Sequence, residues 1–176
     1  MRVASTTRLI KSALECVGMP CIKHDLIRDD AMKKGTTPDG FDCSGLFHFL
    51  LRRNEINIFV SELGREARYA REFFDHIGRR VNSEISAGDL VFFSYDGAMP
   101  THMAMYIGDG TIVHKGFVDT SITTISQTGN YPKMVILSKL DAIAKDRRNA
   151  GNPIVYRHGR GPQRYFNNPI GAKRLI

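Results

Sequence analysis

The sequence predicts a single domain of the α+β class, on three observations. The chain has 176 residues, which is enough for one domain with a core of its own. Its first half carries apolar residues at helical spacing, and its second half carries short β-branched and aromatic runs separated by turns. Helices and strands that are segregated along the chain favour an α+β fold over an alternating α/β fold.

Four segments in the first half carry the helical pattern. Ser5 can cap the first helix, which Gly18 ends, and a more polar helix is expected over residues 25–34. Cys43 opens a third, apolar helix, and the fourth is expected to run from Ser61 to about Phe74.

Strands are predicted from residue 90 onward. The expected strands span residues 90–93, 101–107, 111–114, 122–125, 134–137 and 154–156, and a short helix is expected over 140–147. Gly108, Asp109 and Gly110 form a tight hairpin turn. We expect the domain to occupy residues 1–157, followed by a basic tail over 158–176 that lies on the surface or is disordered.

Charge and hydropathy limit the partners. A formal net charge of +7 implies affinity for an anionic partner, such as nucleic acid, phospholipid or an acidic cell-wall polymer. The first 19 residues contain no apolar core of a secretion signal, and no stretch is long and apolar enough to span a membrane. The three cysteines are too few for a disulfide framework.

The loop before the third helix carries the candidate nucleophile. Residues 40–46, Gly-Phe-Asp-Cys-Ser-Gly-Leu, place Cys43 at the junction of loop and helix. The N–H groups and partial positive charge of a helix N-terminus stabilise a thiolate, so we expect the pKa of this thiol to be lowered. The same N–H groups can bind an oxyanion. Ser44 is expected to act through its backbone, and Asp42 as a helix cap or turn residue.

Two histidines can supply the base. In the predicted hairpin, His102, Ala104 and Tyr106 share one face, and either Val113 or His114 returns opposite Ala104. If His114 does so, it lies diagonally from His102 on the same face, within reach of it. With Cys43 packed on that sheet, the three residues would form a Cys–His–His arrangement.

These blocks resemble the NlpC-type, papain-like cysteine peptidases, which act on bacterial cell-wall peptides. The matching blocks lie in the family's order: 40–46, 88–93, 102–110 and 112–114. The resemblance implies a papain-like fold with N-terminal helices packed on a central antiparallel sheet. It also implies Cys43 as nucleophile, His102 as general base and His114 as orienting residue. Thiol amide hydrolysis by these groups needs no cofactor. The family commonly cuts peptidoglycan stem peptides between γ-D-glutamate and a diamino acid.

The chain departs from the family at Cys21, which stands where members often have a tyrosine that lines the site. If Cys21 lines the site here, it can form an inactivating disulfide with Cys43 under oxidising conditions, a hypothesis that thiol counting tests. Cys16 is expected to be a buried structural residue.

Alternative functions remain open. The same thiol chemistry could serve an acyltransferase or deamidase acting on a lipid or a protein, and a vestigial site would leave a basic wall-binding or nucleic-acid-binding module. We rank nucleic acid low because the basic tail has few aromatic residues. Zinc bound by Cys43 and the two histidines ranks low as well, because no close-spaced pair of ligands exists.

The expected setting follows from the substrate. A wall hydrolase acts in the periplasm or outside the cell, and a phage lysin or an antibacterial toxin exported by specialised machinery would need no general secretion signal. Its partners would be a peptidoglycan peptide and an immunity or inhibitor protein. If the substrate is not the wall, the chain would act in the cytoplasm.

Overall fold

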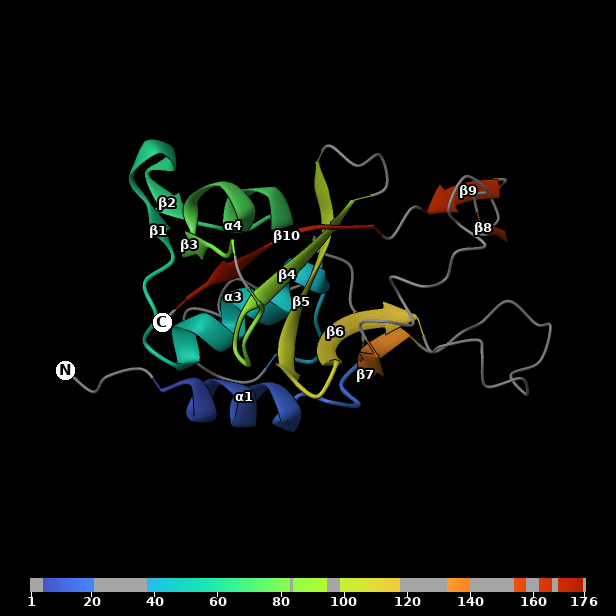
Figure 1. The fold of residues 1–176 in the computed structure, drawn as a ribbon, viewed down its shortest axis with the longest axis horizontal. Coiled ribbons are helices and arrows are strands. Elements are labelled where there is room, and N and C mark those ends of the chain that lie inside the picture. The colour runs from blue at the N-terminus through green and yellow to red at the C-terminus, as the bar shows by residue number, and fades with distance from the viewer. Residues whose placement is uncertain are drawn as a thin grey trace.

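A computed structural model gives the fold of the chain over residues 5–20, 38–82, 84–94, 99–117, 133–139, 154–157, 162–165 and 168–175. The α+β prediction is confirmed. Helices lie on one face of a six-stranded antiparallel sheet whose strand order is β3-β10-β4-β5-β6-β7 (Figure 1). The helices are α1 (Thr6–Glu15), α3 (Cys43–Arg53) and α4 (Ala70–His76). The sheet strands are β3 (Arg79–Arg80), β4 (Leu90–Ser94), β5 (Pro100–Gly108), β6 (Thr111–Phe117), β7 (Lys133–Lys139) and β10 (Asn168–Arg174). Two further pairs are β1 (Phe59–Val60) with β2 (Arg65–Glu66), and β8 (Ile154–Arg157) with β9 (Pro162–Tyr165).

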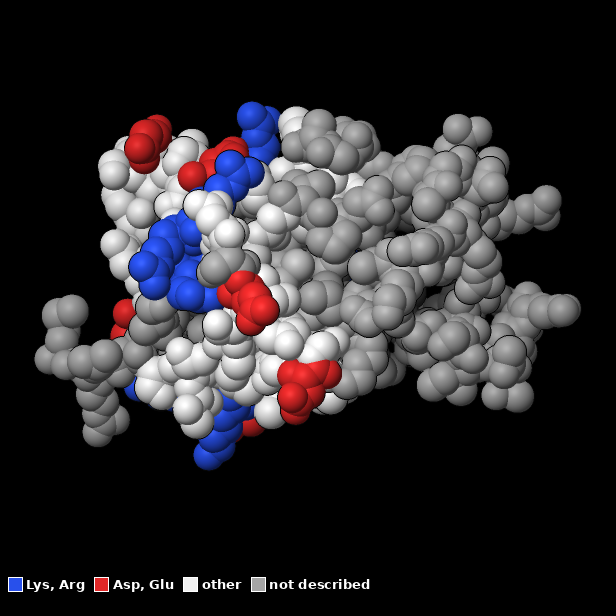
Figure 2. Space-filling model, viewed as in Figure 1, with Lys and Arg blue, Asp and Glu red and all other residues white. Residues whose placement is uncertain are grey.

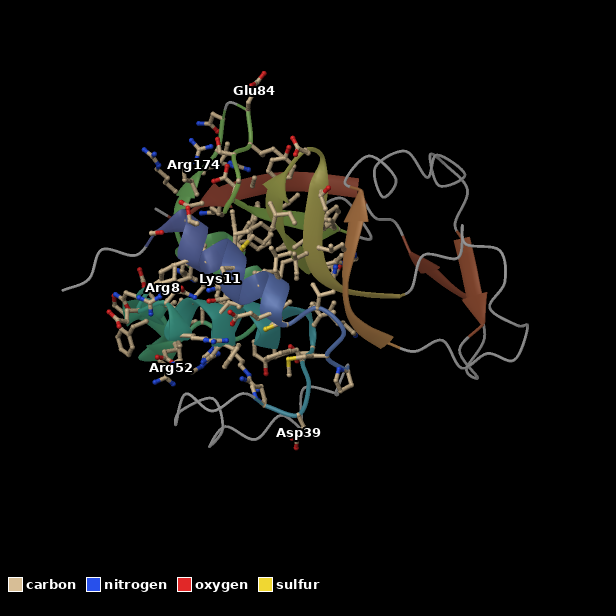
Figure 3. All side chains as sticks on the ribbon, turned by 90° about the horizontal axis from the view of Figure 1, so that it is seen from below. Arg8, Lys11, Asp39, Arg52, Glu84 and Arg174 are labelled. Carbon is tan, nitrogen blue, oxygen red and sulfur yellow. The ribbon has the colours of Figure 1, made fainter. Side chains whose placement is uncertain are left out.

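The first helix begins as the sequence predicts. The Ser5 hydroxyl accepts a hydrogen bond from the N–H of Arg8 at 3.2 Å, which satisfies a free donor of the first turn. Leu9 and Ala13 are fully buried against the core. The Arg8 guanidinium also donates to the carbonyl of Arg53 at the end of α3, at 3.1 Å, so α1 and α3 are joined side by side (Figure 3).

The third predicted helix is α3, and it forms the centre of the core. Its buried side chains include Leu46, Phe47 and Leu50, all with no exposed surface. They pack with Met103 and Met105 of β5 in one apolar cluster. Burying these side chains holds the helix against the sheet, because each large apolar residue contributes about 1.5–3 kcal/mol of transfer free energy.

The fourth helix is shorter than predicted. Residues Ser61–Leu63 form a single 3-10 turn that ends at Gly64, whose φ of 63° is the left-handed conformation that glycine tolerates best. The chain then forms β2, and α4 starts only at Ala70. The Glu72 carboxylate fixes that start, since it accepts hydrogen bonds from the N–H groups of Arg68 and Tyr69.

Most of the predicted strands are present. The strands expected at residues 90–93, 101–107, 111–114, 134–137 and 154–156 are β4, β5, β6, β7 and β8, with ends that differ by a few residues. The strand expected at 122–125 and the helices expected at 25–34 and 140–147 lie outside the described residues.

The C-terminal segment differs from the predicted tail. Within the range 158–176, residues Asn168–Arg174 form β10, which pairs with β3 on one side and β4 on the other. Ala172 is 6% exposed, and the Arg174 guanidinium donates to both carboxylate oxygens of Asp89, at 2.9 and 2.8 Å. Since Asp89 is buried, this ion pair ties the end of the chain to the start of β4. The expectation of a surface or disordered tail is therefore wrong for this strand.

Basic side chains gather on the surface formed by β3 and β10. Figure 2 shows Lys and Arg side chains clustered where these strands lie in Figure 1. The register sets Lys173 opposite Arg80 and Arg174 opposite Arg79. Among the described residues, no helix is both long enough and apolar enough to cross a membrane.

Candidate active site

Cys43 is the first residue of α3, and the segment before it is held in place by the packing of Phe41 and by a backbone hydrogen bond. Phe41 is fully buried, its ring lies 5.3 Å from the ring of Phe49, and its N–H donates to the carbonyl of Pro20 at 3.0 Å. Asp39, earlier in the segment, is exposed and points away from the protein (Figure 3). This anchoring fixes the position at which Cys43 enters the helix, where it is half-buried.

Asp42 caps the helix that Cys43 begins, as expected. Its carboxylate accepts a hydrogen bond from the N–H of Gly45, and the Ser44 hydroxyl donates to the same oxygen at 3.4 Å. The N–H groups of Cys43 and Ser44 lie against the Cys43 sulfur, where each lowers the pKa of the thiol.

The two predicted histidines are in direct contact. His102 Nε2 and His114 Nδ1 are 2.9 Å apart, with the rings at 71° to each other. The register between β5 and β6 pairs Met105 with Val113, so its extension by one residue sets His114 opposite Ala104. This is the register that brings both histidines to one face. The structure therefore resolves the alternative that the sequence left open.

Burial keeps both histidines uncharged. Desolvation lowers the pKa of His102 well below its usual value, and the electrostatic interactions with the His114 ring and with the Lys115 ammonium lower it further. Desolvation also lowers the pKa of His114 to about 4, although a hydrogen bond to the backbone of Lys115 opposes the shift. At neutral pH the pair is neutral, so one ring nitrogen of His102 is available as a base.

The pKa of the Cys43 thiol is shifted in the opposite direction to the one predicted from the sequence. Burial raises the pKa of Cys43, and the carboxylate of Asp42 raises it further. Lys115 and the N–H groups of Ser44 and Cys43 lower it, but their effects are smaller than that of burial. The expected lowering by the helix N-terminus is present, and desolvation outweighs it. The resting site therefore holds a neutral thiol and a neutral imidazole.

The sequence matches the profile of the NlpC/P60 family over residues 33–140. The chain belongs to the NlpC/P60 family. This range contains Cys43, His102 and His114, together with α3 and the strands that carry the histidines.

Relatives of this NlpC/P60 domain include two Bacillus enzymes. It is 35% identical over 94 residues to a gamma-D-glutamyl-L-lysine dipeptidyl-peptidase of Bacillus cereus, covering 52% of this chain and 26% of that protein. It is 32% identical over 130 residues to a gamma-DL-glutamyl hydrolase of Bacillus subtilis, covering 69% of this chain and 28% of that protein. The chain thus spans about a quarter of the length of these relatives.

Solved structures support the fold. A crystal structure of an NlpC/P60 family protein from Bacillus cereus superposes with a TM-score of 0.58 at 23% identity, covering 97% of this chain and 40% of that one. The papain-like α+β architecture predicted for this NlpC/P60 domain is therefore confirmed.

The other residues singled out in the sequence fall into two groups. Cys16 is buried and free, as expected, and burial raises its pKa to about 11. Cys21 lies outside the described residues, so its expected place beside the site stays a prediction, while Cys43 is a free thiol in the structure. No group of three or more metal-ligating side chains occurs in the described part of the chain.

Lys115 is a further charged residue that acts on the predicted site residues, and the sequence did not single it out. Its charge acts on Cys43, His102 and His114 alike. The sequence could not predict this, because strand alternation places a residue next to His114 on the opposite face of the sheet and does not show which layer covers that face.

Proposed function

We propose that this NlpC/P60 domain is a cysteine peptidase that hydrolyses an amide bond in peptidoglycan stem peptides. Cys43 is the nucleophile, His102 the general base and His114 the residue that orients it. The observation that carries the proposal is the 2.9 Å contact between His102 Nε2 and His114 Nδ1, on strands packed against the helix that Cys43 begins. A nucleophile, a base and an orienting group in that order are the requirement for thiol catalysis.

The first step transfers the thiol proton. With Nε2 of His102 engaged by His114, Nδ1 of His102 is the nitrogen that accepts the proton of Cys43. Its Nε2–H then donates to His114 Nδ1, which keeps the ring oriented as it becomes an imidazolium. The raised pKa of Cys43 and the lowered pKa of His102 both favour a neutral thiol and a neutral imidazole. The thiolate therefore forms as the substrate is attacked, and the two groups do not rest as a thiolate–imidazolium ion pair.

The remaining steps follow from the same groups. The thiolate attacks the amide carbonyl, and the oxyanion that develops binds to the N–H groups of Cys43 and Ser44 at the start of α3. His102 then gives its proton to the departing amine nitrogen, which leaves a thioester on Cys43. Water, deprotonated by His102, attacks the thioester and restores the free thiol. Asp42 positions Ser44 and the first turn throughout.

The proposed scissile bond is the amide between γ-D-glutamate and a diamino acid. The names of the two Bacillus relatives, which specify γ-glutamyl substrates, support this choice. The proposed place of action is the bacterial cell wall, in the periplasm or outside the cell. A role as a phage lysin or antibacterial effector, opposed by an immunity protein, is the setting we favour.

Digestion of purified sacculi tests the proposal. Wild type and Cys43→Ala are incubated with sacculi, and the released fragments are identified by mass spectrometry. We expect wild type to release peptide fragments that begin with the diamino acid and to leave stems ending in D-glutamate on the glycan, and the variant to release none. If wild type releases nothing while a thiol-reactive probe labels Cys43, the wall substrate is wrong and an acyltransferase or deamidase becomes the better assignment. If the probe also fails to label Cys43, a non-catalytic binding module becomes the better assignment.

A further inference from the structure

Lys115 lies beside the proposed site but has no part in the mechanism above. It follows His114 on β6, and neighbouring residues of a strand point to opposite faces of the sheet. His114 shares its face with Ile112, in the smaller apolar cluster, so Lys115 shares the other face with Val113.

The face that carries Lys115 is the one on which α3 packs. Val113 and Val135 are fully buried there, in the same cluster as Leu46 and Phe47 of α3. Lys115 is paired with Val135 in the register between β6 and β7. It therefore lies on the α3 side of the sheet, beyond Val113 and half-buried.

The ammonium of Lys115 acts on the reacting groups, and no carboxylate of the described residues neutralises it. Its charge lowers the pKa of the Cys43 thiol and those of both histidines. Within the described ranges no carboxylate forms an ion pair with Lys115. Asp42 also acts on the thiol, but its carboxylate already accepts from Gly45 and Ser44. A half-buried cation without a counter-ion is stabilised by an anionic group of a ligand.

We propose that Lys115 binds a carboxylate of the substrate close to the scissile carbonyl, and so sets specificity for γ-glutamyl amides. This inference rests on the proposed function. In a γ-linked glutamate the carbonyl under attack belongs to the side chain, and the free α-carboxylate is only a few carbon atoms away. An ordinary α-linked peptide has no carboxylate at that place. Lys115 would therefore favour γ-glutamyl amides with a free α-carboxylate over those whose α-group is a neutral carboxamide.

The first test needs no substrate. Cys43 is alkylated with iodoacetate, which carries a carboxylate, and with neutral iodoacetamide, and peptide mapping isolates the rate at Cys43. The ratio of the two rates cancels any change in thiol reactivity. We expect Lys115→Met and Lys115→Gln to lower the ratio about fivefold or more, because a nearby positive charge attracts the anionic reagent. Lys115→Arg and the control Lys11→Met, exposed on α1 (Figure 3), should keep it. An unchanged ratio in Lys115→Met and Lys115→Gln overturns the proposal.

The second test uses two peptides that differ only in the α-group of the γ-D-glutamyl residue, a carboxylate or a carboxamide. Wild type should prefer the carboxylate peptide about tenfold in kcat/KM, and Lys115→Met should lose that preference. If wild type cleaves both peptides and Lys115→Met keeps the wild-type ratio, the specificity role fails while the peptidase stands. If wild type cleaves neither peptide but the alkylation ratio depends on Lys115, the carboxylate site stands and the proposed substrate fails.

Discussion

The buried histidine pair makes the stability of this domain depend on pH. The pKa of His114 is lowered from 6.5 to about 4 in the folded state, where the side chain is 6% exposed. Its folded pKa lies below its unfolded pKa, so the unfolded chain binds more protons in between and stability falls as the solution is acidified. The contribution is present above the unfolded value of 6.5 and is lost as the pH falls toward 4.

The magnitude follows from the two pKa values. Over the full interval the loss approaches roughly 3 kcal/mol, since each pKa unit corresponds to about 1.4 kcal/mol. At about pH 5 the linkage relation gives a loss of about 2 kcal/mol from His114 alone. His102 adds to this loss, because its pKa is also lowered.

His114→Gln isolates the contribution of His114 to the pH dependence of stability, because glutamine keeps an acceptor for His102 but does not titrate. Urea unfolding followed by far-UV circular dichroism at about pH 7.5 and pH 5 gives the free energy of unfolding for each protein. When the pH is lowered from the higher to the lower value, wild type should lose about 2 kcal/mol more unfolding free energy than the variant. His76→Gln removes an exposed histidine of α4 and controls for the loss of a histidine as such. Equal losses of unfolding free energy in wild type and His114→Gln would show that the pKa of His114 is not lowered by folding.

Three further predictions concern the C-terminal strand, the core and the base. Arg174→Met should lower the urea midpoint clearly and Arg79→Met hardly at all, because Arg174, of these two, forms the ion pair with the buried carboxylate of Asp89; equal midpoints would contradict a stabilising role of this ion pair. Leu90→Ala should cost about 3 kcal/mol of unfolding free energy, since this fully buried side chain leaves a cavity, and a cost under about 1 kcal/mol would argue against the observed core. The acid limb of kcat/KM should lie below pH 6.5, because His102 must be neutral and its pKa is lowered; a limb at or above that value contradicts its assignment as the base.

Much of the fold follows from local patterns. Ser5 caps α1 and Cys43 opens α3 as the sequence predicts, because caps and apolar periodicity are local signals. The strands that carry His102 and His114 were predicted for the same reason. The register between these strands could not be decided, since a hairpin pattern permits a shift of one residue. The observed pairing of Met105 with Val113 decides it.

Other features depend on contacts between distant residues. Strand β10 has few apolar residues in its sequence, and it is held by Asp89, 85 residues earlier in the chain. The single helix predicted from Ser61 to about Phe74 is interrupted at Gly64 and by the pairing of Phe59 with Glu66. The direction of the Cys43 pKa shift depends on burial, which composition around the helix start does not report.

In the proposed mechanism, Cys43 carries the acyl group during catalysis. A γ-D-glutamyl peptide is mixed with the protein, the reaction is quenched in acid within the first turnovers, and the protein is mapped by mass spectrometry. We expect the acyl fragment to be found as a thioester on Cys43, labile to hydroxylamine, to be absent from Cys43→Ala and to be reduced in His102→Ala. Cleavage of the peptide with no acyl group detected on Cys43, or with equal turnover by Cys43→Ala, would contradict the assignment of Cys43 as the nucleophile.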